Sequence, residues 1–158
     1  MDMFNKEKSG SQTKRFLEFK LGEESYAVGL LEVKEVITHP EVTPIPKSPA
    51  YVCGLINLRG IVLTVIDLRK KLGIQPSQDK SQEAVIIFDL NDRFVGVVVD
   101  SIHKVLNISE DSVKPVPDSD EKSMAHLLGI LQHEERLTMW IDPAALLEGG
   151  SAVLKAAA

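Results

Sequence analysis

The chain repeats its own pattern of apolar residues, and this repetition limits the folds open to it more than any other feature. Segment 16–37 returns without a gap 69 residues later, and segment 54–72 returns 75 residues later. The motif VTPIP at 42–46 returns as VKPVP at 113–117. The matched positions are apolar in both copies, as these pairs show: Phe19 and Phe88, Val28 and Val97, Val36 and Val105, Ile66 and Ile141, Leu72 and Leu147. The order of the blocks indicates two similar units, 15–74 and 83–149.

Each unit is predicted to be rich in β-strands and to close with a short helix. The run Ile61–Ile66 is rich in β-branched residues and bounded by turn residues, which is typical of a buried strand. Asp67 is expected to cap a helix that ends before Gly73, and Asp142 is expected to do the same in the second unit. Short strands with turn signals at this spacing favour small barrels, which leave no long exposed edge.

The ends of the chain are polar or repetitive in composition. We expect a disordered N-terminal segment over residues 1–14, a folded domain over 15–149 and a frayed alanine-rich tail over 150–158. A length of 158 residues is sufficient for one domain with a substantial core.

Composition argues against several classes of function. The formal net charge of −5 gives nucleic-acid binding no electrostatic basis. No apolar run approaches the roughly 20 residues that a membrane span needs, so we expect a cytoplasmic protein without direct membrane insertion. Cys53 is the single cysteine, and we expect it to serve as a small buried apolar residue.

No catalytic residue, metal ligand set or cofactor motif is recognised. The four histidines lack a close ligand spacing, and the chain contains no nucleophile elbow, phosphate-binding loop or dinucleotide-binding glycine motif. Asp67 and Asp142 resemble paired carboxylates, but helix capping explains them better. The sequence therefore favours a binding module over an enzyme, with a small-ligand-binding β-barrel as a remote alternative.

The two units diverge at one corner. Asn57-Leu58-Arg59-Gly60 in the first unit becomes Gln132-His133-Glu134-Glu135 in the second. This divergence suggests a specialised site near Arg59. An exposed ion pair of Arg59, worth about 0–1 kcal/mol, is the other interpretation, and the residues alone do not decide between the two.

Residues 54–73, GLINLRGIVLTVIDLRKKLG, resemble the signature of the CheW family of bacterial chemotaxis coupling proteins. The resemblance covers about residues 15–148. It includes YAV at 26–28, VKEV at 33–36, VTPIP at 42–46 and FVGVVVD at 94–100. Two departures are Thr64, where the family often carries proline, and the weakly matching region 126–136.

The resemblance implies a fold and a role. The fold would be mostly β, with two pseudo-symmetric five-stranded SH3-like β-barrels that share one hydrophobic core. The role would be a non-catalytic adaptor that couples the cytoplasmic tips of methyl-accepting chemoreceptors to the regulatory domain of the histidine kinase CheA. The same module occurs in CheV-like proteins and in the kinase itself, but this chain is too short to carry their additional parts.

The resemblance also implies site residues by position. The receptor-binding residues would be Val33, Glu35, Gly54, Arg59, Gly60, Val98 and Val99, with Gly54 and Gly60 shaping the corner. The kinase-binding residues would include Lys114 and Ser119.

Overall fold

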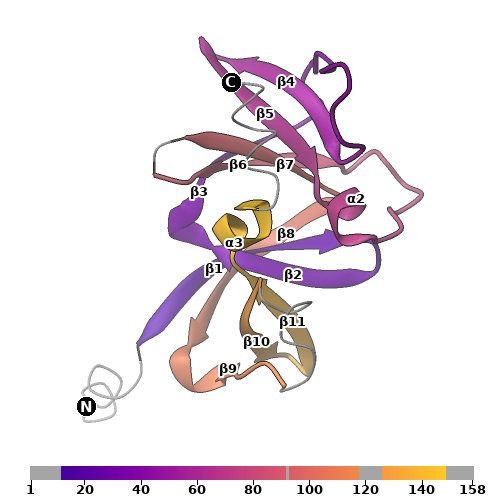
Figure 1. Cartoon of the computed structure of the whole chain (residues 1–158). Helices are drawn as coiled ribbons and strands as arrows, with labels where there is room; N and C mark the ends of the chain where they lie inside the picture. Colours follow the sequence, from indigo (N-terminus) through magenta and orange to yellow (C-terminus); the bar gives the residue numbers. More distant parts are fainter. Residues whose placement is uncertain (1–11, 92, 118–125, 149–158) are drawn as a thin grey trace.

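The computed structural model describes residues 12–91, 93–117 and 126–148 (Figure 1). Most of the predicted disordered segment and the whole predicted tail lie outside these residues. The first strand begins at Thr13, two residues before the predicted boundary of the folded domain. Among the described residues, no helix is long and apolar enough to cross a membrane.

Most strands and the closing helix recur in the same order, as the sequence repeat predicts. The first series comprises β1 (Thr13–Leu21), β2 (Glu24–Gly29), η1 (Leu30–Glu32), β3 (Val33–Ile37), β4 (Val52–Leu58), β5 (Ile61–Asp67) and α2 (Leu68–Leu72). The second comprises β6 (Ala84–Asp89), β7 (Phe94–Val99), β8 (Ser101–Ser109), η2 (Glu110–Ser112), β9 (Val113–Lys114), β10 (Leu127–His133), β11 (Arg136–Ile141) and α3 (Pro143–Glu148). The two series differ in that η1 precedes the third strand of its series whereas η2 follows it, and the two-residue strand β9 has no counterpart in the first series. The prediction of a mostly β fold is confirmed.

Each of the two sheets combines strands from both repeats. The six-stranded sheet has the order β8-β1-β2-β11-β10-β9, and the five-stranded sheet has the order β3-β6-β7-β5-β4. The hairpin that opens each repeat therefore pairs with the later strands of the other repeat. Apolar periodicity did not indicate this exchange, because it shows which side of a strand is buried but not which strands are neighbours.

Strand register follows the same internal symmetry. The parallel pair of Tyr26 with Met139 corresponds to the pair of Val95 with Thr64 when 69 and 75 are added to the first-repeat numbers. The register shift next to Glu18 in the β1–β8 ladder likewise corresponds to a shift in the β3–β6 ladder. The two repeats thus share their backbone pairing as well as their apolar pattern.

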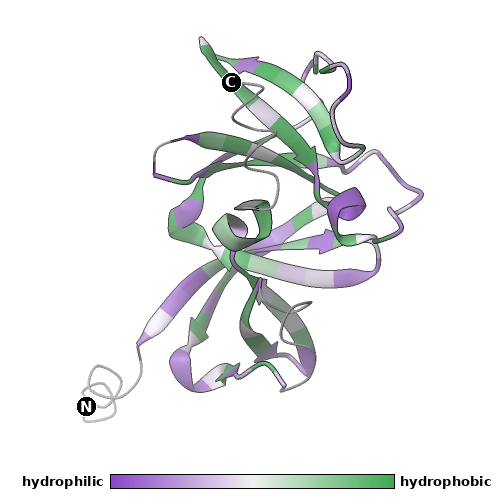
Figure 2. Cartoon of the chain, in the orientation of Figure 1, coloured by the Kyte–Doolittle hydropathy of each residue, from purple (hydrophilic) through white to green (hydrophobic). Residues whose placement is uncertain are grey.

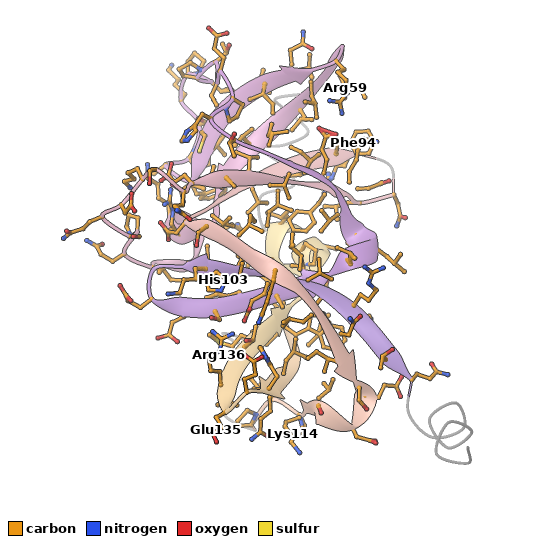
Figure 3. The ribbon with its side chains drawn as sticks, turned by 180° about the vertical axis from the view of Figure 1, so that it is seen from behind. Arg59, Phe94, His103, Lys114, Glu135 and Arg136 are labelled. Carbon is orange, nitrogen blue, oxygen red and sulfur yellow. The ribbon has the colours of Figure 1, made fainter. Side chains whose placement is uncertain are left out.

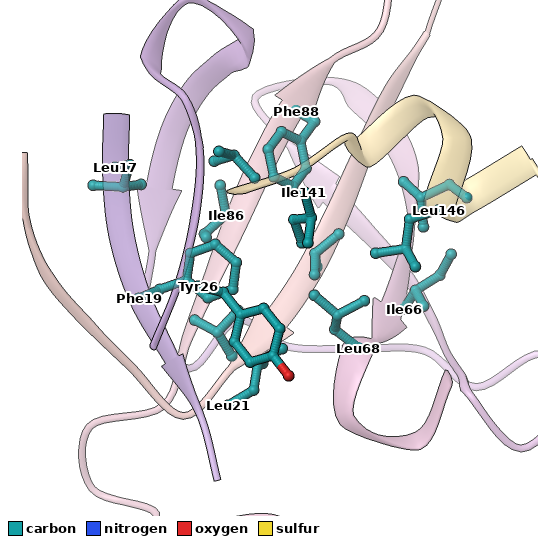
Figure 4. Close-up of a cluster of buried hydrophobic side chains, with 14 of the residues drawn as sticks. Leu17, Phe19, Leu21, Tyr26, Ile66, Leu68, Ile86, Phe88, Ile141 and Leu146 are labelled. Carbon is teal, nitrogen blue, oxygen red and sulfur yellow. The ribbon is translucent and has the colours of Figure 1, made fainter. Parts of the chain in front are cut away.

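The central core lies between the two sheets and beneath both helices (Figure 4). Val28, Val97, Ile66 and Ile141 are at most 2% exposed, which confirms that the repeat-related positions face inward in both copies. Burying each such side chain stabilises the fold by roughly 1.5–3 kcal/mol.

The helices begin and end as their sequences predict. The Asp67 side chain accepts from the Arg69 backbone N–H at 3.0 Å, and Asp142 accepts from the Ala144 N–H at 3.1 Å. Gly73 ends α2 with a φ of 73°. The helices differ in polarity, since α2 is hydrophilic in Figure 2 whereas α3 is largely hydrophobic.

Candidate interaction site

The corner between β4 and β5 is a two-residue hairpin loop. Leu58 pairs with Ile61, so Arg59 and Gly60 form the loop, with φ values of 51° and 90°. Positive φ at both loop residues matches the right-handed twist of the flanking strands. The backbone N–H of Gly60 donates to Oδ1 of Asn57 at 2.9 Å, which holds the loop. The loop presents the Arg59 side chain, 65% exposed, to solvent.

Arg59 forms an ion pair with Glu35, which brings together two of the residues that the resemblance assigns to the receptor site. Nη2 of Arg59 donates to Oε1 of Glu35. Glu35 lies on β3 and Arg59 follows β4, and these strands form opposite edges of the five-stranded sheet. The sheet must therefore curve so that its two edges approach each other at this corner. Because the pair is largely exposed, it contributes about 0–1 kcal/mol and orients the side chains more than it stabilises the fold.

An aromatic side chain lies beside the ion pair. Phe94, at the start of β7, packs against the apolar cluster of this sheet and lies close to Arg59 in Figure 3. Nζ of Lys34 is 5.0 Å from the centroid of the Phe94 ring. The sequence reasoning named neither residue, although Phe94 opens the matched FVGVVVD motif and Lys34 precedes Glu35. The corner therefore offers an aromatic surface bordered by charges of both signs.

The predicted valines lie deeper than Arg59. Val33 is half-buried and packs against the central core, and Val98 is half-buried against the apolar cluster of the five-stranded sheet. Val99 is fully buried in the central core. A partner at the native surface would not contact the Val99 side chain, whose contribution would be to support its neighbours.

The two predicted glycines are constrained by different geometry. A Cβ at Gly54 would lie 2.2 Å from the backbone oxygen of Thr43, because Thr43 and Leu55 form a β-bridge beside it. A Cβ at Gly60 would meet nothing within 4 Å, so at this position the positive φ, not a lack of space, favours glycine.

Lys114 lies far from Arg59. It is exposed on β9 and pairs with Ile130 of β10, at the opposite end of the molecule in Figure 3. Ser119, the other predicted kinase-binding residue, lies outside the described residues. The predicted receptor and kinase positions that can be placed are thus on separate surfaces.

Arg69 is the centre of a buried charge network that the sequence reasoning missed. Its side chain is 4% exposed and donates to Asp67 at 2.9 Å, to Glu83 at 2.8 Å and to Asp100 at 2.7 Å. Asp100 also accepts from the backbone N–H of Gly22 at 2.6 Å. Burial opposes ionisation of Asp67, but the hydrogen bonds and charge of Arg69 outweigh it and hold the pKa of that carboxyl below its ordinary value.

Cys53 is half-buried, which makes it less enclosed than the sequence suggested. Burial, followed by the charge of Asp67, raises the pKa of its thiol, which favours the protonated, unreactive form. Within the described part of the chain, histidine, cysteine and carboxylate side chains form no cluster that could hold a metal ion.

Two mixed sheets around a common core, with a charged corner at one end, define a mostly β scaffold. More particularly, the chain belongs to the CheW-like domain family, which it matches over residues 15–150. It is 33% identical over 132 residues to the chemotaxis protein CheW of Rhizobium meliloti, a match that covers 82% of this chain and 84% of that protein. It is 31% identical over 135 residues to CheW of Bacillus subtilis, covering 85% and 86%.

A solved structure shows the same fold. The crystal structure of the scaffolding protein TtCheW from Thermoanaerobacter tengcongensis superposes with a TM-score of 0.80 at 32% sequence identity, covering 87% of this chain and 94% of that one. The assignment to the CheW family made from residues 54–73 is confirmed, and the chain has the fold of a chemotaxis scaffolding protein.

Proposed function

We propose that this chain is a non-catalytic adaptor that couples the cytoplasmic tips of chemoreceptors to the histidine kinase CheA. Family membership and the scaffolding relative support a role in chemotaxis signalling. In this proposal the protein is cytoplasmic and is recruited to receptor arrays at the membrane through its partners. It supplies two binding surfaces and carries out no chemical step.

The receptor surface of the proposal is the corner around Arg59, and the observation that carries it is the Arg59–Glu35 ion pair across the two edges of one sheet. In the described structure Glu35 engages only Nη2 of Arg59, which leaves other donors of the guanidinium fork free for a partner. Phe94, which lies close to Arg59 in Figure 3, adds apolar area at the same corner. A helical hairpin fits such a surface, because its apolar face can cover the ring while its polar residues bind the fork.

The kinase surface of the proposal lies at the other end of the molecule, around Lys114. This lysine is exposed on the short strand β9, and it is remote from Arg59 in Figure 3. Separate surfaces would allow receptor and kinase to be bound at the same time, which is what a coupling protein requires. Ser119 belongs to this proposal by its sequence position alone.

The test is a pair of titrations with matched variants. Arg59→Ala should weaken receptor-tip binding by about 5- to 150-fold, or roughly 1–3 kcal/mol, and should leave kinase binding unchanged. Lys114→Ala should show the reverse pattern. A denaturant melt should show a loss of less than about 1 kcal/mol for either variant, since both side chains are exposed. Equal weakening of both partners by Arg59→Ala, or unchanged receptor binding, would contradict the assignment.

A further inference from the structure

The two repeats each form a hollow at the same place, and the second hollow is the larger. The first, of about 350 Å³, is lined by residues that include Cys53, Val65, Asp67 and Arg69. The second, of about 580 Å³, is lined by residues that include Lys14, Leu31, Glu32, Leu128, Trp140 and Asp142. Adding 75 to Cys53, Val65 and Asp67 gives Leu128, Trp140 and Asp142, so the two hollows are equivalent by the internal symmetry.

The first hollow is bordered by a bound guanidinium group. The guanidinium of Arg69 is bound there by Asp67, Glu83 and Asp100. In the second hollow the position equivalent to Arg69 is Ala144, which is exposed and has no group that could fill the space. The carboxylate of Asp142 remains in place, in the same helix-capping geometry as Asp67. Of the three carboxylates that hold Arg69, the second hollow keeps only the counterpart of Asp67, because Lys14 stands at the position of Glu83 and Leu31 at that of Asp100. The second carboxylate on the rim of this hollow is Glu32, and no side chain of α3 fills the space that Arg69 occupies in the first.

The second hollow has further features that suit a cation. Burial, followed by the charge of Asp142, raises the pKa of the Glu32 carboxyl even though Lys14 acts in the opposite direction, so a further positive charge would relieve an unfavourable interaction there. The Trp140 ring already carries a cation, because Nζ of Lys14 is 4.7 Å from its centroid. Lys14 is exposed on a long flexible stem and can be displaced, although Arg15 on the same rim remains as an opposing charge.

The second hollow also has two exposed leucines where the first has an aspartate and a cysteine. Leu31 is 98% exposed and Leu128 is 46% exposed, whereas the residue equivalent to Leu31 is Asp100 of the buried charge network. Exposed leucines around a charged hollow match an arginine side chain, whose aliphatic stem packs against them while its fork binds the carboxylates.

We propose that the hollow between Leu31, Trp140 and Asp142 binds the arginine side chain of a protein partner, in place of the guanidinium that Arg69 supplies in the equivalent hollow. This inference goes beyond the coupling function proposed above, since it concerns a surface assigned there to neither receptor nor kinase. The partner presents an arginine with apolar neighbours, and it displaces Lys14 from the Trp140 ring.

The single tryptophan of the chain makes this proposal directly testable. In a ¹⁵N-labelled sample of the full chain, the indole N–H of Trp140 gives one resolved signal. Titration with N-acetyl-arginine amide should shift that signal saturably. N-acetyl-citrulline amide has nearly the same shape without the charge, and it should bind at least about tenfold more weakly if the carboxylates recognise the guanidinium.

Three variants and a control complete the experiment. Asp142→Asn retains a capping side chain but should weaken arginine-amide binding at least about fivefold. Ala144→Arg should place an internal guanidinium in the hollow and abolish the response, with the rest of the spectrum showing a folded protein. Lys14→Ala should strengthen binding, because it removes the competing cation. Glu41→Gln, at an exposed carboxylate elsewhere, should change nothing. Equal shifts with citrulline amide, a non-saturating response, or unchanged binding by Ala144→Arg would overturn the proposal.

Discussion

The two ends of the molecule share one backbone design, and each carries an ion pair, with the positive and negative positions exchanged between the two ends. At the first end Arg59, in the β4–β5 loop with a φ of 51°, binds Glu35 of β3. At the second end Glu134, in the β10–β11 loop with a φ of 49°, lies 3.8 Å from Lys104 of β8. Adding 69 to Glu35 gives Lys104, and adding 75 to Arg59 gives Glu134. An ion pair thus occurs at equivalent positions in both repeats with its charges exchanged, but only the Arg59–Glu35 pair is hydrogen-bonded.

The interiors behind these loops differ as well. At the first end Ile87 and Leu63 are buried within an apolar cluster. The equivalent residues at the second end are Glu18, which is fully buried, and Thr138, whose hydroxyl donates to the Glu18 carboxylate at 2.9 Å. Arg136 lies 3.4 Å from the same carboxylate. A buried carboxylate is tolerated in this scaffold because it has partners of its own.

This comparison shows how a duplicated chain acquires two different ends. The apolar pattern and the register fix a common backbone, and a few polar residues then give each end its own charge and its own interior. Different ends are what a protein needs if it is to bind two different partners at once.

The largest expected effect concerns the charge network of α2, which α3 lacks. Arg69→Ala leaves the carboxylates of Asp67 and Asp100 buried without their cation, so the free energy of unfolding should fall by about 3–5 kcal/mol. Lys70→Ala, at an exposed position on the same helix, should change it by less than about 0.5 kcal/mol. Denaturant melts of both variants measure the difference.

The pH dependence of the Arg69→Ala variant gives a sharper check. In the native protein the pKa of Asp67 is lowered, so its stabilising contribution is present above its ordinary pKa and is lost as the pH falls through the lower folded value. Without Arg69, acid should relieve the uncompensated carboxylates by protonating them. The stability gap between variant and native protein should therefore narrow toward about pH 4, and a gap that is independent of pH would argue against this account.

The second prediction compares equivalent buried positions at the two ends. Glu18→Gln keeps the volume of the side chain but removes charge-assisted hydrogen bonds with Thr138 and Arg136, and should cost about 1–3 kcal/mol. Ile87→Gln places the same amide in the apolar cluster of the first end and should cost at least as much, because nothing there is positioned to bind it. If Glu18→Gln melts at the same temperature as the native protein, the hydrogen bonds of Glu18 with Thr138 and Arg136 contribute nothing to stability.

Much of this fold could be predicted from the sequence, because the spacing of apolar residues indicates which side chains are buried. Val28 and Val97 are buried as their repeat positions indicate, and Asp67 and Asp142 cap helices as their local sequences predict. The pairing of strands from different repeats did not follow, because contacts between distant segments depend on the packing of the whole chain.

The site was only partly predictable for a related reason. Arg59 was identified because its corner diverges between repeats, and the structure places it against Glu35, which the family resemblance had named. The reversed pair of Lys104 and Glu134 was missed, although the offsets that reveal the repeat also align these residues with Glu35 and Arg59. The burial of Arg69 was missed because a basic residue in a short helix ordinarily indicates a solvent-exposed face.

The third prediction tests whether the sign of the ion pair matters. The double variant Glu35→Lys with Arg59→Glu gives the first end the charge arrangement of the second. Its stability should lie within about 1 kcal/mol of the native protein, because the pair is restored at an exposed site. Receptor-tip binding, under the function proposed above, should fall at least as far as in Arg59→Ala, since the fork is replaced by a carboxylate. Native receptor affinity in the double variant would mean that the geometry of the corner matters and its charge does not.

The smallest expected effect lies at the second hollow, where Glu32 contrasts with the paired carboxylates of the first. The folded pKa of Glu32 is raised by burial and by Asp142, so the folded state binds its proton more tightly than the unfolded state. The contribution of Glu32 to the free energy of unfolding is therefore favourable below its ordinary pKa and is lost as the pH rises through the raised folded pKa. At neutral pH the charged, partly buried carboxylate is a penalty to stability.

Glu32→Gln should remove that penalty and stabilise the protein at pH 7 by less than about 1 kcal/mol, because the carboxyl is partly solvated. At about pH 3.5 the variant and native protein should melt alike. Destabilisation by Glu32→Gln at pH 7 would show that the charge of Glu32 is already compensated within the chain, by Lys14 or another cation. The carboxylates of the two hollows would then both be paired, and the two hollows would differ less than proposed.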